Sequence, residues 1–260
     1  MMLCALSGLV PASAQQPPTE SLKNLLPAGA EIIETADLSA IARKPRLMVL
    51  WMLRPKRNLD GRIYANNQGG SCSDVIHGDF GKFWEGPTRL SLFDSEEMRL
   101  INTLKIPEGC PGCKEGRDTL TIPLCVLNPN SRVRNPGSDR AGKPNLDLRD
   151  ITGEGLNAEF TLLVFEAYGI ASTAVFGYEP NSDLVVQYPI EILHSSKRPL
   201  TTLWTEQVFA TEPVRPGFWK FTWEPGHGDP GIFDEEVSFD RTRRLFVQKE
   251  AVRLPKVSGR

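Results

Sequence analysis

Short runs rich in apolar, β-branched and aromatic residues recur along the chain, and Gly, Pro or charged residues bound each run. This pattern is typical of β-strands, and no segment shows the sustained period of a long amphipathic helix. We therefore expect an all-β fold, an antiparallel meander that is either propeller-like or a sandwich. The predicted strands are Ala30–Thr35, Leu47–Leu53, Arg89–Phe93, Met98–Ile106, Thr119–Leu127, Leu146–Arg149, Phe160–Phe165, Ser172–Tyr178, Leu184–Tyr188, Phe218–Trp223, Phe233–Phe239 and Arg243–Val247.

Turn residues connect several of these strands. Asp94–Glu97 and Glu179–Ser182 each lie between two predicted strands and indicate hairpins. Asp240–Arg241 has the composition of a tight turn, so the last three predicted strands are expected to form a closing meander.

Two segments carry helical signals. Thr19–Leu26 can form one helical turn, because Thr19 or Ser21 can cap its start and Pro27 ends it. In Leu200–Phe209 the apolar residues follow helical spacing, although the Thr, Trp, Val and Phe content favours a strand. We predict a short helix there, so the fold is expected to contain one or two short helices.

The charge balance excludes one class of partner. The 260 residues include 30 Lys and Arg and 32 Asp and Glu, which gives a formal net charge of −2. Non-specific nucleic-acid binding needs a strong basic excess, so no nucleic-acid partner is expected. No shift in composition divides the chain, and residues 30–260 are interpreted as one β domain.

The N-terminal residues have the pattern of an export signal. The apolar run Leu3–Val10 is followed by Ala12–Ala14, a triplet of small residues, and residues 1–14 carry no charge. We interpret residues 1–14 as a secretory signal peptide cleaved after Ala14, and residues 15–29 as a linker with the short helical turn. No other stretch approaches the roughly 20 apolar residues of a membrane helix, so no transmembrane segment is expected. The expected location is the periplasm or the outside of the cell.

The cysteines fit an oxidising compartment. Of the five cysteines, Cys4 lies in the predicted signal peptide, which leaves Cys72, Cys110, Cys113 and Cys125. An even number in an exported protein predicts two disulfides, with three connectivities open, and the Pro-Gly turn favours pairing Cys110 with Cys113. The alternative for this C-x-x-C is a redox motif or half of a zinc site, although no helix follows it as a redox motif requires.

The segment Leu146–Phe165 places oxygen-bearing side chains at alternate positions of a Gly-rich loop. Such alternation, followed here by Gly155, lets a short loop wrap a hard cation. We predict one bound Ca²⁺ ion; the alternative is a hairpin turn whose acidic residues face water. The predicted calcium ligands are Asp150, Thr152, Glu154, the Leu156 carbonyl and Glu159.

Three resemblances accompany these patterns. The Asp150–Glu159 loop resembles the calcium loops of FG-GAP and VCBS repeats, which sit between propeller strands, although Ala158 stands where a further carboxylate is usual. The hairpin Thr88–Ile106 resembles one hairpin of the YVTN-type β-propeller repeats. Over Leu47–Ile106 and Leu146–Ile190 the chain resembles a group of uncharacterised exported bacterial proteins, which implies export and a β-rich fold and implies no activity.

Two side-chain groups remain. Trp219, Phe221 and Trp223 alternate, so on a strand they face one side, where an exposed row would bind a ligand by stacking on sugar rings and a buried row would be core. A basic cluster that includes Arg46 and Arg54 brackets the apolar run Leu47–Leu53. One interpretation is contact with an anionic surface, such as a phosphorylated polysaccharide or a lipid headgroup; the simpler one is that the charges guard the strand against edge pairing.

Together these patterns indicate an exported, non-catalytic β-rich binding or structural module that calcium stabilises, with a carbohydrate or another cell-envelope component as its partner. Three alternatives stay open: a secreted hydrolase with a carboxylate pair, a thiol oxidoreductase that uses Cys110 and Cys113, and a carbohydrate-binding protein. The sequence contains no G-x-S-x-G, P-loop or H-E-x-x-H motif.

Overall fold

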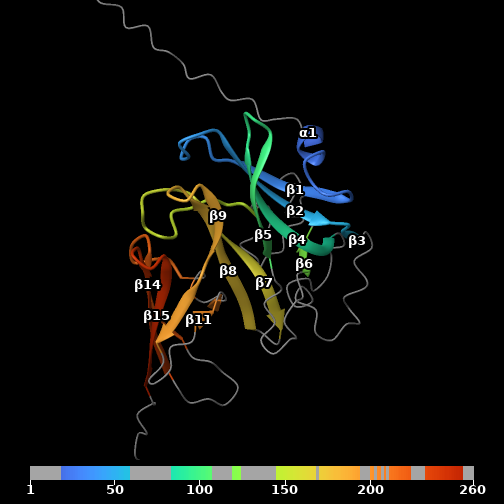
Figure 1. Ribbon diagram of the computed structural model, residues 1–260. Coiled ribbons are helices and arrows are strands. Elements are labelled where there is room, and N and C mark those ends of the chain that lie inside the picture. Colours follow the sequence, from blue (N-terminus) through green and yellow to red (C-terminus); the bar gives the residue numbers. More distant parts are fainter. Residues whose placement is uncertain are drawn as a thin grey trace, which may run out of the picture.

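The computed structural model is built of β-sheets (Figure 1). It describes residues 19–58, 83–106, 119–123, 145–167, 170–193, 200–201, 204–205, 208, 211–223 and 232–253. These residues form α1 (Thr19–Lys23), β1 (Ala30–Asp37), β2 (Arg46–Leu53), β3 (Lys56–Asn58), β4 (Phe83–Asp94), β5 (Arg99–Ile106), β6 (Thr119–Pro123), β7 (Glu159–Ala167), β8 (Ile170–Glu179), β9 (Leu184–Tyr188), β10 (Ile190–Leu193), β11 (Leu200–Thr201), β12 (Trp204–Thr205), β13 (Phe218–Trp223), β14 (Ile232–Asp240) and β15 (Leu245–Arg253). Val208 is also helical.

The strands form three sheets. The N-terminal sheet has the order β1-β2-β4-β3, and β5 and β6 also pair with β4. The middle sheet has the order β12-β8-β7, with β9 paired to β8. The C-terminal sheet has the order β11-β10-β15-β14-β13. Among the described strands the pairing is antiparallel, except that β10 and β15 run parallel.

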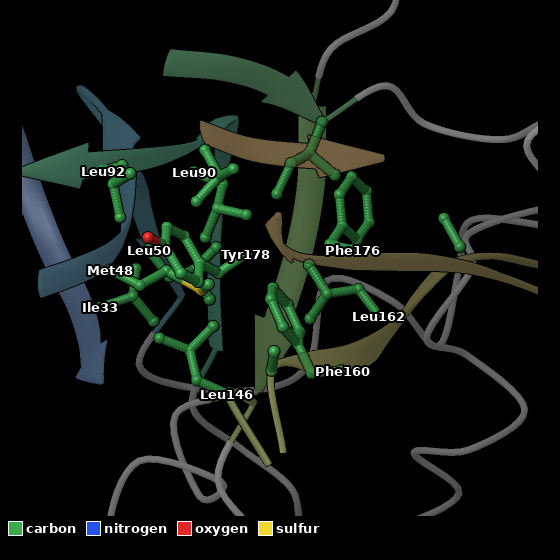
Figure 2. Packing of buried hydrophobic residues seen from close by; sticks show 14 of the residues in the cluster. Ile33, Met48, Leu50, Leu90, Leu92, Leu146, Phe160, Leu162, Phe176 and Tyr178 are labelled. Carbon is green, nitrogen blue, oxygen red and sulfur yellow. The ribbon is translucent and has the colours of Figure 1, made fainter. Parts of the chain in front are cut away.

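Strand β2 is buried on both faces because it lies in the interior of its sheet and between two layers. Its alternate residues Met48, Leu50 and Met52 belong to the first core, which the N-terminal and middle sheets share. Figure 2 shows Met48 and Leu50 in this core. Leu47 and Val49, with Trp51, point the other way and share a separate cluster with Leu22 of α1 and Leu26, which follows the helix.

Strand β8 divides its side chains between two cores in the same way. Phe176 and Tyr178 join the first core with Phe160 of β7, as Figure 2 shows. Val175 points to the opposite face and joins the second core, which includes Trp219 and residues of the C-terminal sheet. The middle sheet therefore lies between the other two (Figure 1), and the fold is a sandwich of stacked sheets.

One length of chain belongs to two of these layers. Strand β9 ends at Tyr188 in the middle sheet, and β10 begins at Ile190 in the C-terminal sheet. Pro189 joins them, and its carbonyl accepts a hydrogen bond from the Phe246 amide at 2.9 Å. Two neighbouring sheets are thus connected by nearly continuous extended backbone.

A buried arginine connects the N-terminal and middle sheets. Arg46 at the start of β2 is 2% exposed, and its Nη1 donates to Asp94 Oδ2 at 2.7 Å. Its Nε and Nη2 donate to the two carboxylate oxygens of Asp183 at 2.8 and 2.6 Å, and Asp183 lies in the turn between β8 and β9. Tyr178 Oη also donates to Asp183, at 3.0 Å. We call these four residues the Arg46 clamp.

A side-chain amide joins the same two sheets. Asn102 Nδ2 donates to the Val185 carbonyl at 2.9 Å, and the Val185 amide donates to Asn102 Oδ1 at 3.1 Å. The reciprocal pair satisfies one backbone donor and one backbone acceptor of β9 without a further strand.

Most predicted elements agree with the structure. The short N-terminal helix, the hairpins β4–β5 and β8–β9, and the closing meander β13–β14–β15 are confirmed. Within the described residues, no helix has both the length and the apolar character that crossing a membrane requires.

Three expectations are wrong. A helix is wrong for the first half of Leu200–Phe209, because Leu200–Thr201 pairs with β10 as β11 and Trp204–Thr205 pairs with β8 as β12; Val208 is helical. Leu146–Arg149 forms no strand; Arg149 makes one isolated bridge with Glu159. Arg46 does not guard an edge, because β2 is paired along both of its sides.

We expect Arg46→Met to lower the free energy of unfolding by about 3–5 kcal/mol, because it leaves the buried Asp94 without its cation. Arg99→Met is the control. Arg99 forms an exposed ion pair with Glu97 on the β4–β5 hairpin, which also carries Asp94, so this substitution should lower the free energy of unfolding by only about 0–1 kcal/mol. Urea unfolding followed by tryptophan fluorescence compares the two variants. Equal losses would show that the clamp contributes no more than a surface ion pair.

Candidate functional site

The backbone of the predicted calcium loop lies against Pro216 and Gly217, the two residues that precede β13. Gly153 and Gly217 both have φ of 74°, a conformation that favours glycine. A side chain at Gly153 would collide with the Pro216 carbonyl, and one at Gly217 would collide with the Thr152 carbonyl. The two glycines therefore let the backbone of the loop lie directly against the backbone that leads into the C-terminal sheet.

The loop holds its own shape through Asp150. Asp150 Oδ1 accepts a hydrogen bond from the Glu154 amide at 2.9 Å, and Oδ2 accepts one from the Gly155 amide at 3.0 Å. Gly155 itself has φ of 86°. Short polar side chains commonly order turns in this way by satisfying nearby backbone donors.

Glu159 closes the loop from inside the protein. It is 2% exposed, and its Oε2 accepts hydrogen bonds from the Ile151 amide at 2.9 Å and the Thr152 amide at 3.2 Å. Burial raises the pKa of Glu159 to about 7, and the nearby charge of Asp150 adds to the rise, while the two amides act in the opposite direction. The loop thus contains a buried carboxyl group that titrates near neutral pH.

Arg244 joins this loop to both neighbouring sheets. Its Nη1 donates to Glu154 Oε1 at 2.5 Å, and its Nη2 pairs with Glu179 at the end of β8. The guanidinium carbon lies 5.8 Å from the ring centre of Tyr188 and 5.1 Å from that of Phe239. We call these five residues the Arg244 junction, since they bring together the loop, the middle sheet and the C-terminal sheet.

The predicted calcium ligands are close in sequence, but their side chains serve different partners. Asp150 bonds to loop amides, Glu154 to Arg244 and Glu159 to amides beneath the loop, while Leu156 packs against the first core. In the described part of the chain, no three His, Cys, Asp or Glu residues form a metal-binding group. A carboxylate oxygen that accepts one hydrogen bond keeps a further lone pair, so calcium binding by this loop stays a prediction.

The aromatic row of β13 lies in the second core. Trp219 and Phe221 are 4% and 8% exposed, and Trp223 is half-buried and stacks on Phe233 with ring centres 4.8 Å apart. Trp219 also contacts Phe246, with ring centres 6.4 Å apart. Sugar binding by this row remains a prediction, and it would require these rings to become uncovered.

A buried acid beside this row was not singled out from the sequence. Glu235 of β14 is 1% exposed, and Glu250 of β15 lies directly opposite it in the register. The sequence pattern indicates its burial, because Glu235 alternates with Phe233, Val237 and Phe239 and therefore points to the same apolar face of the strand.

The opposite face of the C-terminal sheet is polar. Lys220 Nζ pairs with Glu236 Oε1 at 2.8 Å. Asp234 accepts hydrogen bonds from Thr222 at 2.6 Å and from Arg253 Nη2 at 2.7 Å. These five residues are the outer polar face, which presents alternating charges to solvent across β13, β14 and β15.

Cys72, Cys110, Cys113 and Cys125 lie outside the described residues, so both disulfides stay predictions. Comparison of the chain with models of known families, with curated proteins and with solved structures finds no match. The resemblances to propeller repeats and to exported bacterial proteins also stay predictions. The chemistry of this protein is therefore inferred from its own residues.

Glu159 makes the stability of the fold depend on pH. Because its folded pKa of about 7 lies above the ordinary value of 4.5, its contribution is full below pH 4.5 and is lost as pH rises through 7. We expect a loss of roughly 3 kcal/mol from this group between about pH 4 and 8. Glu159→Gln keeps an oxygen for the two amides and should remove that loss. Urea unfolding in the presence of a chelator checks this, and an unchanged pH profile in the variant would contradict it.

Proposed function

We propose that this chain is an exported, non-catalytic β-rich binding or structural module, located in the periplasm or outside the cell. The observation that supports this best is which partners the charged groups of the clamp, the junction and the loop bind. The Arg46 clamp and the Arg244 junction connect neighbouring sheets, and the remaining carboxylates of the loop bond to its own backbone. These groups are occupied in holding the layers together.

The hydrolase alternative would need a reachable carboxylate pair, and the facing pair Glu235 and Glu250 does not fit that requirement. Glu235 is almost fully covered, and both of its oxygens accept hydrogen bonds, from Trp223 and from Gln248. General acid catalysis requires contact with the substrate oxygen. In this conformation Glu235 is therefore a structural group of the second core.

A binding module needs an exposed face, and the outer polar face offers one. It is formed by side chains of three neighbouring strands, and Lys220 and Thr222 of β13 are exposed. Its charges and hydroxyl group can form hydrogen bonds with the hydroxyl and charged groups of an envelope polysaccharide or another cell-envelope component. We propose this face as the binding surface.

We further propose that calcium stabilises the Asp150–Glu159 loop. Extracellular calcium modules have dissociation constants of roughly 10⁻⁴ to 10⁻³ M, so about 10 mM calcium would add roughly 1.4 to 2.7 kcal/mol. For a chain of this size the melting temperature should rise by about 3–10 °C. Asp150→Asn should remove this rise and Asp147→Asn, outside the loop, should not. A wild-type melting curve that is the same in calcium and in chelator would make the loop a simple turn.

The binding role is tested with the exported wild-type chain, which should begin within a residue or two of Gln15 on N-terminal sequencing. The chain is mixed with insoluble cell-wall polysaccharide and with envelope membranes, and the bound fraction is measured. Lys220→Ala combined with Arg253→Ala should weaken retention about tenfold, since charge-assisted hydrogen bonds are lost, while the melting temperature changes little. Arg99→Ala, on the N-terminal sheet, is the matched control.

Two results would contradict the proposed function. The first is a wild-type chain that is retained by neither material, or retained equally well after the double substitution. The second is turnover of a polysaccharide that is lost in Glu235→Gln, which would favour the hydrolase.

A further inference from the structure

The C-terminal sheet buries a carboxylate among neutral partners. Trp223 Nε1 donates to Glu235 Oε1 at 2.5 Å, and Gln248 Nε2 donates to Oε2 at 2.6 Å. Both donors are uncharged, so they satisfy the oxygens of Glu235 but leave its negative charge uncompensated. Within the described residues, no Lys or Arg forms an ion pair with Glu235.

The described side chains of β13 and β15 that share the face of Glu235 add no positive charge. From β13 the row Trp219, Phe221 and Trp223 faces the same side of the sheet, and from β15 the only charged neighbour among the described residues of that face is the acidic Glu250. Tyr188 of the middle sheet is a titratable side chain of the second core. Arg244 also lies against this core, over Tyr188 and Phe239, but its guanidinium pairs with Glu154 and Glu179. An ionised Glu235 therefore places negative charge in an apolar layer beside a second acid.

This arrangement favours the protonated form of Glu235. Burial raises the pKa of Glu235, and the charge of Glu250 raises it further, while the bonds from Trp223 and Gln248 lower it. An uncompensated charge in an apolar core is expensive, and protonation removes that cost.

We propose that Glu235 is a pH-sensitive switch for the meander β13–β15. While Glu235 is protonated, the apolar face of the meander packs on the middle sheet; when Glu235 ionises, the packing of the meander loosens. The proposal rests on the burial of Glu235 and on its neutral and acidic neighbours, and it is independent of the proposed binding role.

The direction of the effect follows from linkage. A carboxyl group that holds its proton more tightly in the folded chain than in the unfolded chain contributes its full stability at acid pH. That contribution is lost as the pH rises through the folded pKa. Each pH unit in this window should lower the ratio of folded to unfolded chain by up to about tenfold on account of Glu235.

The test compares wild type with Glu235→Gln by urea unfolding between about pH 5 and about pH 8, in chelator. Gln keeps an oxygen acceptor, and the Gln248 amide can turn to present its own oxygen, so the variant should fold. We expect the wild type to lose stability with rising pH and the variant to lack this part of the loss. Glu159 is present in both chains, so its contribution cancels in the comparison.

The matched control is Glu236→Gln, one residue along on the outer polar face. Its salt bridge with Lys220 lowers the pKa of Glu236 below the ordinary 4.5, so Glu236 is ionised in the folded and the unfolded chain throughout this pH range, and the substitution should leave the slope of the pH profile unchanged. Identical profiles for wild type and Glu235→Gln would overturn the proposal.

A second measurement uses the Glu159→Gln chain, in which the predicted pH dependence from Glu159 is absent. Hydrogen-exchange protection factors, corrected for the intrinsic effect of pH, should fall in β13, β14 and β15 as the pH rises, while β2 and β4 keep theirs. A uniform fall over all three sheets, or none, would show that Glu235 does not control the meander.

Discussion

The turn between β8 and β9 bears the ion pairs that hold the sheets together. Asp183 in this turn binds Arg46 of the N-terminal sheet, and Glu179 at its start binds Arg244 of the C-terminal sheet. The Asp183 amide donates to the Glu179 carbonyl at 2.9 Å, so both carboxylates project from one ordered unit. The Arg46–Asp183 pair is bidentate and therefore has a fixed geometry, while Arg244 divides its two Nη groups between Glu179 and Glu154. The two carboxylates of this turn thus fix the middle sheet against both of its neighbours.

This constraint matters because the middle sheet is covered on both faces. Apolar packing has little directionality, so Phe176 and Val175 would tolerate small sliding of the layers over them. Directional contacts to Arg46, to Asn102 and to Arg244 remove that freedom. The charged groups of this fold therefore contribute register, and the apolar groups contribute the larger part of the stability.

Local signals in the sequence predict the strands well and predict their partners poorly. The turn at Glu179–Ser182 and the apolar run Leu47–Leu53 predict a hairpin and a strand, and both are present. The parallel pairing of β10 with β15 was not predictable, because no local pattern shows that the chain changes sheets at Pro189. Arg46 was grouped with surface charges for a similar reason, since its partner Asp183 is 137 residues away. The candidate site was likewise predicted only in part. The loop residues were named from their spacing, but Arg244, which binds Glu154, is 90 residues away in the sequence and could not be assigned to the loop.

The position of the middle sheet has a consequence for how the chain matures. Strands β7, β8 and β9 leave the synthesising ribosome before β13, β14 and β15 do, so the face that carries Val175 and Tyr188 is made before its cover exists. During that interval an apolar surface and its strand edges are open to other chains. The N-terminal sheet can dock early, whereas the second core can form only when β15 has arrived to pair with both β14 and β10. Vectorial folding of this protein is therefore completed by its last described strand, and premature termination before that strand would release a half-covered, aggregation-prone chain.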